Sequence, residues 1–119
     1  MMPNESPLDM EILDENAEIG MEGLRELIDM YLTQADEIRA NLQVAIRTGT
    51  ASDVEHLAHK LAGSSAVCGV NVMAPPLRAL EQRGREGQLS DAGQLLAQMT
   101  ERLELSRRLL AEYLAEKEQ

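Results

Sequence analysis

Aromatic residues are scarce in this sequence of 119 residues, which contains no Phe, no Trp and only two tyrosines, Tyr31 and Tyr113. Hydrophobic residues still make up 44% of the chain. A core must therefore be built from Leu, Ile, Val, Met and Ala, a mixture that favours helices packed on helices over a β-sandwich. Cys68 is the only cysteine, which excludes an internal disulfide, and its place on an apolar stripe predicts a small buried side chain.

Basic residues and long apolar runs are scarce as well. The chain has 11 Lys and Arg against 21 Asp and Glu, a formal net charge of −10, which argues against binding to a phosphate backbone. No apolar run approaches the roughly 18 residues that a membrane span needs. The N-terminus shows no positively charged segment followed by an apolar run, as a secretory signal would. We therefore predict a cytoplasmic protein that binds neither nucleic acid nor membrane.

Apolar residues recur at three- and four-residue steps along most of the chain, as they do on amphipathic helices. The predicted helices cover 8–16, 21–48, about 50–68, about 74 to 84 or 87, and about 91 onward. Because the connections are short, neighbouring helices should be antiparallel. We predict an all-α fold, an up-and-down antiparallel four-helix bundle with an additional short N-terminal helix. Residues 8–119 would form the single, monomeric domain, after a flexible N-terminus over 1–7.

Glycine, proline and polar residues mark the expected helix ends. Gly49, Gly69 and either Gly84 or Gly87 are expected to end helices. Pro75 and Pro76 fit a first helical turn, where their missing N–H groups are not needed. Thr50 or Ser52 would cap the third helix, and in the second case Glu55 would complete a capping box. The last helix would be capped by Ser90 and Asp91.

His59 is the residue that points most directly to a function. The inward stripe of its helix centres near Leu57, Leu61 and Ser65, and His59 lies roughly 150° away on the helical wheel. Gly63 follows one turn later on the same outward face, although glycine inside a helix costs about 1 kcal/mol relative to alanine. A bare stretch of backbone beside an exposed histidine suits a nucleophile that another protein must approach closely. An ordinary surface histidine is the alternative, since small residues also allow close helix packing.

A wider pattern surrounds this histidine. The run His59-Lys60-Leu61-Ala62-Gly63-Ser64-Ser65, followed by Gly69, Leu80-Glu81 and Gly84-Arg85, resembles the histidine phosphotransfer (HPt) domain. Residues 8–13 and 24–32 are similar to the first two helices of that family, so the resemblance covers nearly the whole chain. The resemblance implies a phosphorelay intermediate whose histidine accepts a phosphoryl group from a receiver-domain aspartate and passes it to another receiver.

The resemblance also implies roles for individual residues. His59 would be the phosphoryl acceptor, attacking through Nε2 while Nδ1–H donates a hydrogen bond that fixes the tautomer. Glu81 would accept that bond, although a solvated helix carboxylate is the alternative. Arg85 would contact phosphoryl oxygens or pair with Glu81. Many members of the family carry Lys at the position of Ala62, and here Lys60 is the substitute candidate for a phosphoryl contact because its long side chain can reach back.

Partners and cofactors follow from the same resemblance. It implies response-regulator receiver domains and a hybrid sensor histidine kinase as partners, docking on the exposed face of the second and third helices. The docking candidates are Gln34, His56, Gly63, Ser64, Ala66 and Val67. The sequence has no nucleotide-binding loop, so we expect a stand-alone shuttle without kinase activity or a cofactor, to which the receiver brings Mg²⁺. His56 and His59 lack the further ligands that a metal site needs.

Two other functions are compatible with parts of the sequence. A helical adaptor would bind receivers without itself carrying phosphate, and the missing lysine at Ala62 favours this alternative. A small all-helical enzyme would need charged groups facing inward on several helices. The predicted stripes offer almost none, which argues against the enzyme.

Overall fold

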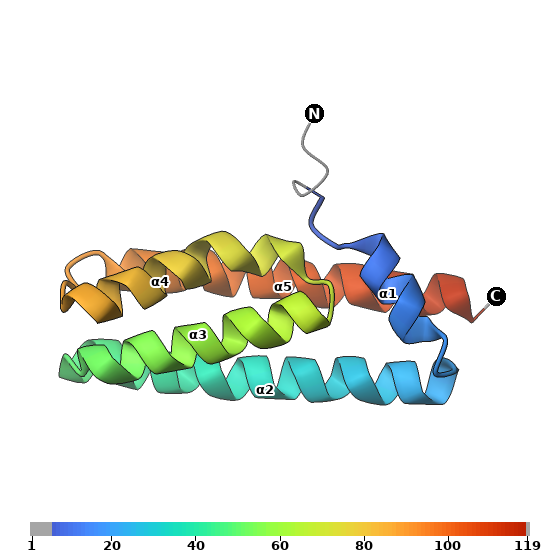
Figure 1. Cartoon of the computed structure of the whole chain (residues 1–119), viewed down its shortest axis with the longest axis horizontal. Coiled ribbons are helices and arrows are strands. Elements are labelled where there is room, and N and C mark those ends of the chain that lie inside the picture. Colours follow the sequence, from blue (N-terminus) through green and yellow to red (C-terminus); the bar gives the residue numbers. More distant parts are fainter. Residues whose placement is uncertain (1–5, 119) are drawn as a thin grey trace.

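The computed structural model describes residues 6–118, and in this part of the chain all regular structure is helical. The elements are α1 (Met10–Ala17), α2 (Met21–Thr48), α3 (Ala51–Val67), a short 3₁₀ turn η2 (Asn71–Met73), α4 (Ala74–Glu86) and α5 (Ala92–Lys117). Helices α2 to α5 run up and down as an antiparallel bundle, and α1 lies apart from it near one end (Figure 1). The predicted fold is confirmed.

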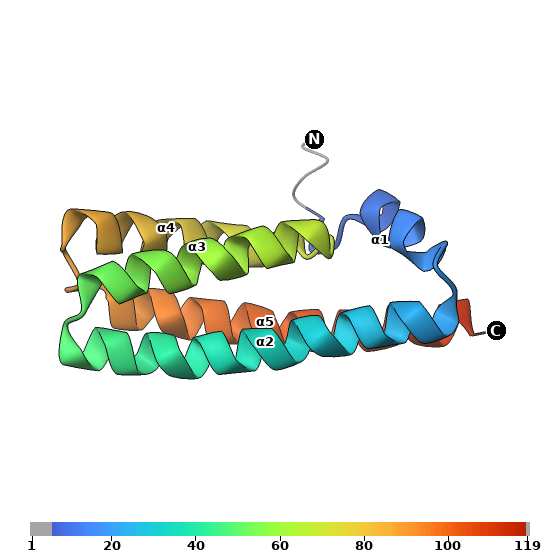
Figure 2. The same cartoon turned by 60° about the horizontal axis from the view of Figure 1, so that its bottom comes forward.

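The helices of the bundle differ in length, and α1 packs where the longer helices protrude. Helices α2 and α5 extend beyond α3 and α4, and α1 lies over the protruding end (Figure 2). Asp14 on α1 accepts a hydrogen bond of 2.8 Å from the Tyr113 hydroxyl on α5. Asn16 on α1 donates to the Val67 carbonyl of α3, at 3.3 Å. These contacts tie α1 to two helices of the bundle.

The N-terminal segment over 1–7 that we expected to be flexible lies largely outside the described residues, which begin at Ser6. Its end is attached to the bundle, because the Pro7 carbonyl accepts a hydrogen bond of 3.0 Å from the Val72 amide. Leu8, the next residue, is buried. None of the helices over 6–118 is both long enough and apolar enough to cross a membrane.

The core consists of aliphatic side chains together with the two tyrosines, Tyr31 and Tyr113. The Tyr31 hydroxyl lies 2.6 Å from the Ser65 hydroxyl, so this buried polar pair is satisfied. Contrary to the prediction from the sequence, the buried stripe of α3 does not include Leu57, since Leu57 is only half-buried. The buried residues of α3 are Val54, Ala58, Leu61, Ala62 and Ser65. Small alanine side chains on this stripe let the neighbouring helix come close.

Most predicted helix ends are confirmed. Gly49 and Gly87 adopt left-handed φ values of 74° and 69° directly after α2 and α4, the backbone conformation that glycine adopts most easily. Gly69, also left-handed at φ 74°, follows the end of α3. Gly84 does not end α4, because it lies buried inside that helix. Pro75 and Pro76 occupy the first turn of α4, as expected.

The two predicted side-chain caps are wrong. Helix α3 begins at Ala51 after Thr50, and the Thr50 side chain makes no capping bond. Ser52 lies inside the helix, where its hydroxyl is 3.5 Å from His56 Nδ1, so it forms no capping box. Asp91 stands at the N-cap of α5 but does not cap it either. Its carboxylate accepts instead from Arg83 Nε at 2.9 Å, because a charged donor binds it more strongly than a backbone amide does.

Candidate functional site

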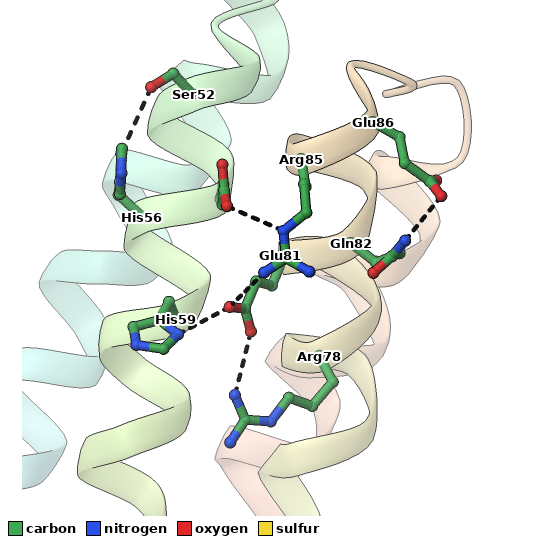
Figure 3. A network of polar contacts seen from close by, with 9 residues as sticks. Ser52, His56, His59, Arg78, Glu81, Gln82, Arg85 and Glu86 are labelled. Atoms are coloured by element: carbon green, nitrogen blue, oxygen red, sulfur yellow. Dashed lines mark hydrogen bonds and ion pairs between the residues drawn. The ribbon is translucent and has the colours of Figure 1, made fainter.

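His59 lies on the solvent-facing side of α3, and 70% of its side chain is exposed. Its Nδ1 is 2.8 Å from Glu81 Oε2 on α4 (Figure 3). The sequence placed these two residues 22 positions apart on different helices, and the structure brings them into hydrogen-bonding contact. The ring is therefore accessible to another protein and fixed in orientation.

Gly84 explains why α4 lies close enough for this contact. A Cβ atom at Gly84 would lie 2.5 Å from the Glu55 amide nitrogen and 2.7 Å from the Ala51 carbonyl oxygen. Real Cβ atoms do not approach backbone atoms this closely, so a side chain here would push α4 away from α3. Glu81 is less than one turn before Gly84 on α4, and its reach to His59 depends on this close packing.

Glu81 is nearly buried, with 8% of its surface exposed, and both of its carboxylate oxygens are used. Oε1 accepts from Arg78 Nη1 at 3.1 Å, while Oε2 accepts from Arg85 Nη2 at 3.2 Å in addition to His59. Burial acts to raise the pKa of Glu81, but hydrogen bonds from His59 and Arg78 outweigh it, so this pKa is lower than usual. Glu81 is therefore an ionised acceptor at neutral pH.

The ionised carboxylate settles which ring nitrogen of His59 carries the proton. An anion offers only acceptor oxygens, so Nδ1 must donate and therefore bears the hydrogen. In the neutral ring the lone pair is then on Nε2. Figure 3 shows the second ring nitrogen of His59 turned away from Glu81. The arrangement presents a nucleophilic nitrogen on the open side of the ring.

Arg85 and Lys60, the two basic residues predicted to contact phosphoryl oxygens, lie in different surroundings. Arg85 bridges the helices, because its Nε donates to Glu55 Oε2 on α3 at 3.2 Å and its Nη2 donates to Glu81. Of the two uses predicted for Arg85, the structure contains the pairing with Glu81. Lys60 is exposed on α3 next to His59, while Ala62 is buried. Sequence reasoning missed Arg78, although its spacing of three residues before Glu81 on one helix was a usable signal.

The predicted docking residues fall into three places. A groove of about 390 Å³ between α2 and α3 is lined by Leu27, Met30, Tyr31, Gln34, Gly63, Ser64, Val67 and Cys68, four of which were docking candidates. His56 lines a second hollow nearer the α2–α3 connection, together with Val44 and Asn41. Ala66 is exposed and lines neither.

The groove also contains an exposed methionine that sequence reasoning missed. Met30 is 70% exposed and Val67 is 67% exposed, so the groove has apolar side chains at its rim. The signal for Met30 was an apolar residue off the buried stripe of its helix. A Cβ added at Gly63 would meet nothing within 4 Å, so the space above this glycine is open. Over the described residues, no three His, Cys, Asp or Glu side chains gather closely enough to hold a metal ion.

The comparisons with known proteins agree with this geometry. The Hpt domain family matches residues 26–114. The crystal structure of histidine-containing phosphotransfer protein B (HptB) from Pseudomonas aeruginosa PAO1 is similar, with a TM-score of 0.87 and 26% identity over 93% of this chain and 96% of that one. A search of curated proteins finds no match. The chain belongs to the Hpt domain family and has a histidine phosphotransfer role in phosphorelays.

Proposed function

We propose that His59 is the phosphoryl acceptor, which receives its phosphoryl group from a receiver-domain aspartate and passes it to the aspartate of another receiver. The observation that carries this proposal is the 2.8 Å contact between Nδ1 and Glu81 Oε2, on a histidine that is 70% exposed. The contact orients the ring and leaves Nε2 with the lone pair on the open side. Imidazole in this state is a good nucleophile near neutral pH.

The transfer step is a simple displacement at phosphorus. The Nε2 lone pair of His59 forms a bond to phosphorus, the bond between phosphorus and the aspartyl oxygen breaks, and its electron pair leaves on the aspartate carboxylate. The proton on Nδ1 stays in place, and the Glu81 carboxylate faces the positive charge that develops on the ring. The receiver would supply Mg²⁺ and most of the stabilisation of the transferring group. The return step is the reverse displacement.

Lys60 and Arg85 are the two predicted phosphoryl contacts. Lys60 follows His59 directly and is exposed, so its ammonium group can turn toward phosphoryl oxygens on Nε2. Arg85 is held by Glu55 through Nε and by Glu81 through Nη2, so its side chain is less free to turn. Lys60 is therefore the first candidate for such a contact, and Arg85 is the second.

Receiver docking would cover the groove between α2 and α3. Met30 and Val67 provide exposed apolar area, and Gly63 lets a partner backbone pass close to His59. Interfaces of this kind bury an apolar centre within a polar rim. Gln34, Ser64 and His56 would belong to the polar rim, and the exposed Ala66 would lie beside them. We place the chain as a monomeric shuttle between the receiver of a hybrid sensor histidine kinase and that of a response regulator, without kinase activity of its own.

Incubation with a phosphorylated receiver domain tests this function. We expect the wild-type chain to gain an acid-labile, base-stable phosphate and His59→Gln to gain none while keeping its helical circular dichroism. His56→Gln, a matched change at the other histidine, should still become labelled. Retained labelling of His59→Gln would refute the site. Receiver binding without any transfer would instead support the adaptor alternative, which the buried Ala62 favours because it offers no cation to the phosphate.

A further inference from the structure

Four charged side chains form a network between α3 and α4 next to the His59 ring (Figure 3). The α3–α4 charge network consists of Glu55, Arg78, Glu81 and Arg85. Arg78 pairs with Glu81 Oε1 at 3.1 Å, and Arg85 pairs with Glu81 Oε2 and Glu55 Oε2 at 3.2 Å each. Two carboxylates and two guanidinium groups have no net charge together, whereas the whole chain has a net charge of −10.

A carboxylate that orients a histidine also has a second effect, which opposes phosphoryl transfer to that histidine. A neighbouring anion favours the protonated, positively charged ring. The imidazolium carries hydrogen on both nitrogens and has no lone pair for attack. Unbalanced carboxylates would also repel the anionic phosphoryl group as it approaches. Without the cations, Glu81 would thus orient the ring of His59 while Glu81 and Glu55 together reduced its reactivity.

We propose that Arg78 and Arg85 are positioning residues that fix the Glu81 carboxylate and offset the charge of Glu81 and Glu55, so that an anion orients His59 without uncompensated negative charge beside the reacting ring. Each arginine binds a different oxygen of Glu81, which also fixes the plane of the carboxylate that faces Nδ1. Arg85 neutralises Glu55 as well. The catalytic meaning of this inference rests on the proposed function of His59.

Other titratable groups lie on α2, α3 and α4. On α3, His56 and Lys60 are exposed neighbours of His59, and Asp53 lines a hollow together with His56. On α2, Asp29 and Glu37 line a hollow together with Gln34. On α4, Glu86 accepts a hydrogen bond from Gln82. Carboxylates, lysines and arginines ordinarily keep their charge between about pH 6 and 8, so these groups keep a constant charge over the pH range of the tests below.

Ring titration by ¹⁵N NMR of the full-length chain tests the electrostatic part. The sequence contains only two histidines, so the spectrum of His56→Gln identifies the signals of His59. In Arg78→Gln/Arg85→Gln the midpoint of the His59 ring titration should rise by about half a unit to one unit, because the remaining carboxylates favour the protonated ring. The matched control is Arg83→Gln, whose arginine pairs with Asp91, and it should follow the wild type.

The single variants Arg78→Gln and Arg85→Gln keep the test usable if the double variant does not fold. Each should give a smaller upward shift than the double variant. A His59 midpoint that stays constant or falls in these variants overturns the proposal.

Labelling by phosphoramidate, a small phosphoryl donor, tests the consequence for reactivity. At about pH 6 the double variant should be labelled about three- to tenfold more slowly than the wild type. This deficit should shrink toward about pH 7.5, because an imidazole is ordinarily unprotonated there. A merely structural role would give the same deficit at every pH, and that result overturns the proposal. A label that persists in His59→Gln would instead refute the proposed acceptor, without affecting the ring titration.

Discussion

At the scale of single residues, one carboxylate sets the orientation of the His59 ring. Glu81 holds Nδ1 at 2.8 Å, and its own lowered pKa, kept low against burial by hydrogen bonds from His59 and Arg78, makes it an acceptor at neutral pH. The lone pair is therefore placed on Nε2. A histidine on a surface helix without such a partner would exchange between two tautomers and many ring orientations.

Removal of Glu81 should slow phosphoryl transfer more than it disturbs the fold. We expect Glu81→Ala to lower the transfer rate by about tenfold to a hundredfold, the size of effect that loss of an orienting partner of a histidine has in metal sites. Glu81→Gln should keep part of the activity, because its amide oxygen still accepts from Nδ1. Quenching the reaction with a phosphorylated receiver at successive times measures the transfer rates of both Glu81 variants. A rate for Glu81→Ala equal to that of the wild type would contradict the role of Glu81.

The sequence predicted the pair of His59 and Glu81 better than it predicted the charged residues around this pair. His59, Glu81 and Arg85 were all named from the motif, and the structure brings them together. Arg78 was missed, because the motif pattern contains no basic residue at its position. Lys60 was named as a substitute for the lysine missing at Ala62, because it follows His59 directly and its long side chain can reach back. Side-chain pairing depends on rotamers that the sequence pattern does not fix.

At the scale of helices, the site depends on the close approach of α3 and α4. Gly84 faces backbone atoms of Glu55 and Ala51 at distances that leave no room for a Cβ. From the sequence alone, Gly84 was one of two glycines predicted to end this helix, because glycine often ends helices. Only the crossing of two helices reveals that a glycine inside a helix serves packing, and local sequence patterns do not contain this information.

Gly84→Ala tests the close approach. We expect a loss of about 1–3 kcal/mol in the free energy of unfolding, since the added methyl group forces the helices apart. The contact between His59 and Glu81 should lengthen, and the transfer rate should fall. Gly93→Ala is the matched control, because Gly93 lies in α5 with nothing within 4 Å of an added Cβ, and it should stabilise by up to about 1 kcal/mol. Urea unfolding of both variants measures the difference; equal effects would contradict the packing argument.

The groove between α2 and α3 gives a second test at this scale. Gly63→Gln should fold normally, since the space above Gly63 is open and glutamine is the better helix former. The new side chain would stand on the proposed docking surface, so transfer from a phosphorylated receiver should fall by about tenfold or more, because each 1.4 kcal/mol of lost binding is a factor of ten. Labelling by phosphoramidate should fall much less. Equal losses with both donors would show that Gly63 is not part of the docking surface.

At the scale of the whole molecule, stability should depend on pH through the buried tyrosines. Burial raises the pKa of Tyr31 to about 12, from 10.0. A neutral group with a raised pKa stabilises the fold fully below its unfolded pKa, and this contribution is lost as pH rises through the folded pKa. Two units correspond to about 2–3 kcal/mol. The free energy of unfolding should therefore fall between about pH 10 and pH 12.

Tyr31→Phe separates this effect from general alkaline damage. The variant should lose about 1 kcal/mol at neutral pH, because the Ser65 hydroxyl loses its partner. Its free energy of unfolding should fall less steeply above pH 10, although Tyr113, whose pKa is also raised to about 12 by burial, keeps part of the slope. An identical slope in Tyr31→Phe and the wild type would contradict the assignment to Tyr31.

The architecture of the whole chain was the part that the sequence predicted best. The apolar period of α2, the left-handed glycines Gly49 and Gly87, and the paired prolines at the start of α4 are local signals, and each is confirmed. The Ser52 cap failed because the helix begins one residue earlier, and the Asp91 cap failed because its carboxylate binds Arg83 instead. The groove could be anticipated only as a helix face, since its shape arises from how α2 and α3 pack.

The central claim is that Nε2 of His59 is the reacting atom because Glu81 holds Nδ1. Phosphorylation by a receiver domain, followed by ¹⁵N and ³¹P NMR of the intact chain, tests it most directly. We predict a phosphorus–nitrogen bond at Nε2 of His59, with hydrogen still on Nδ1. Phosphate on Nδ1 of His59, or on His56, would contradict it.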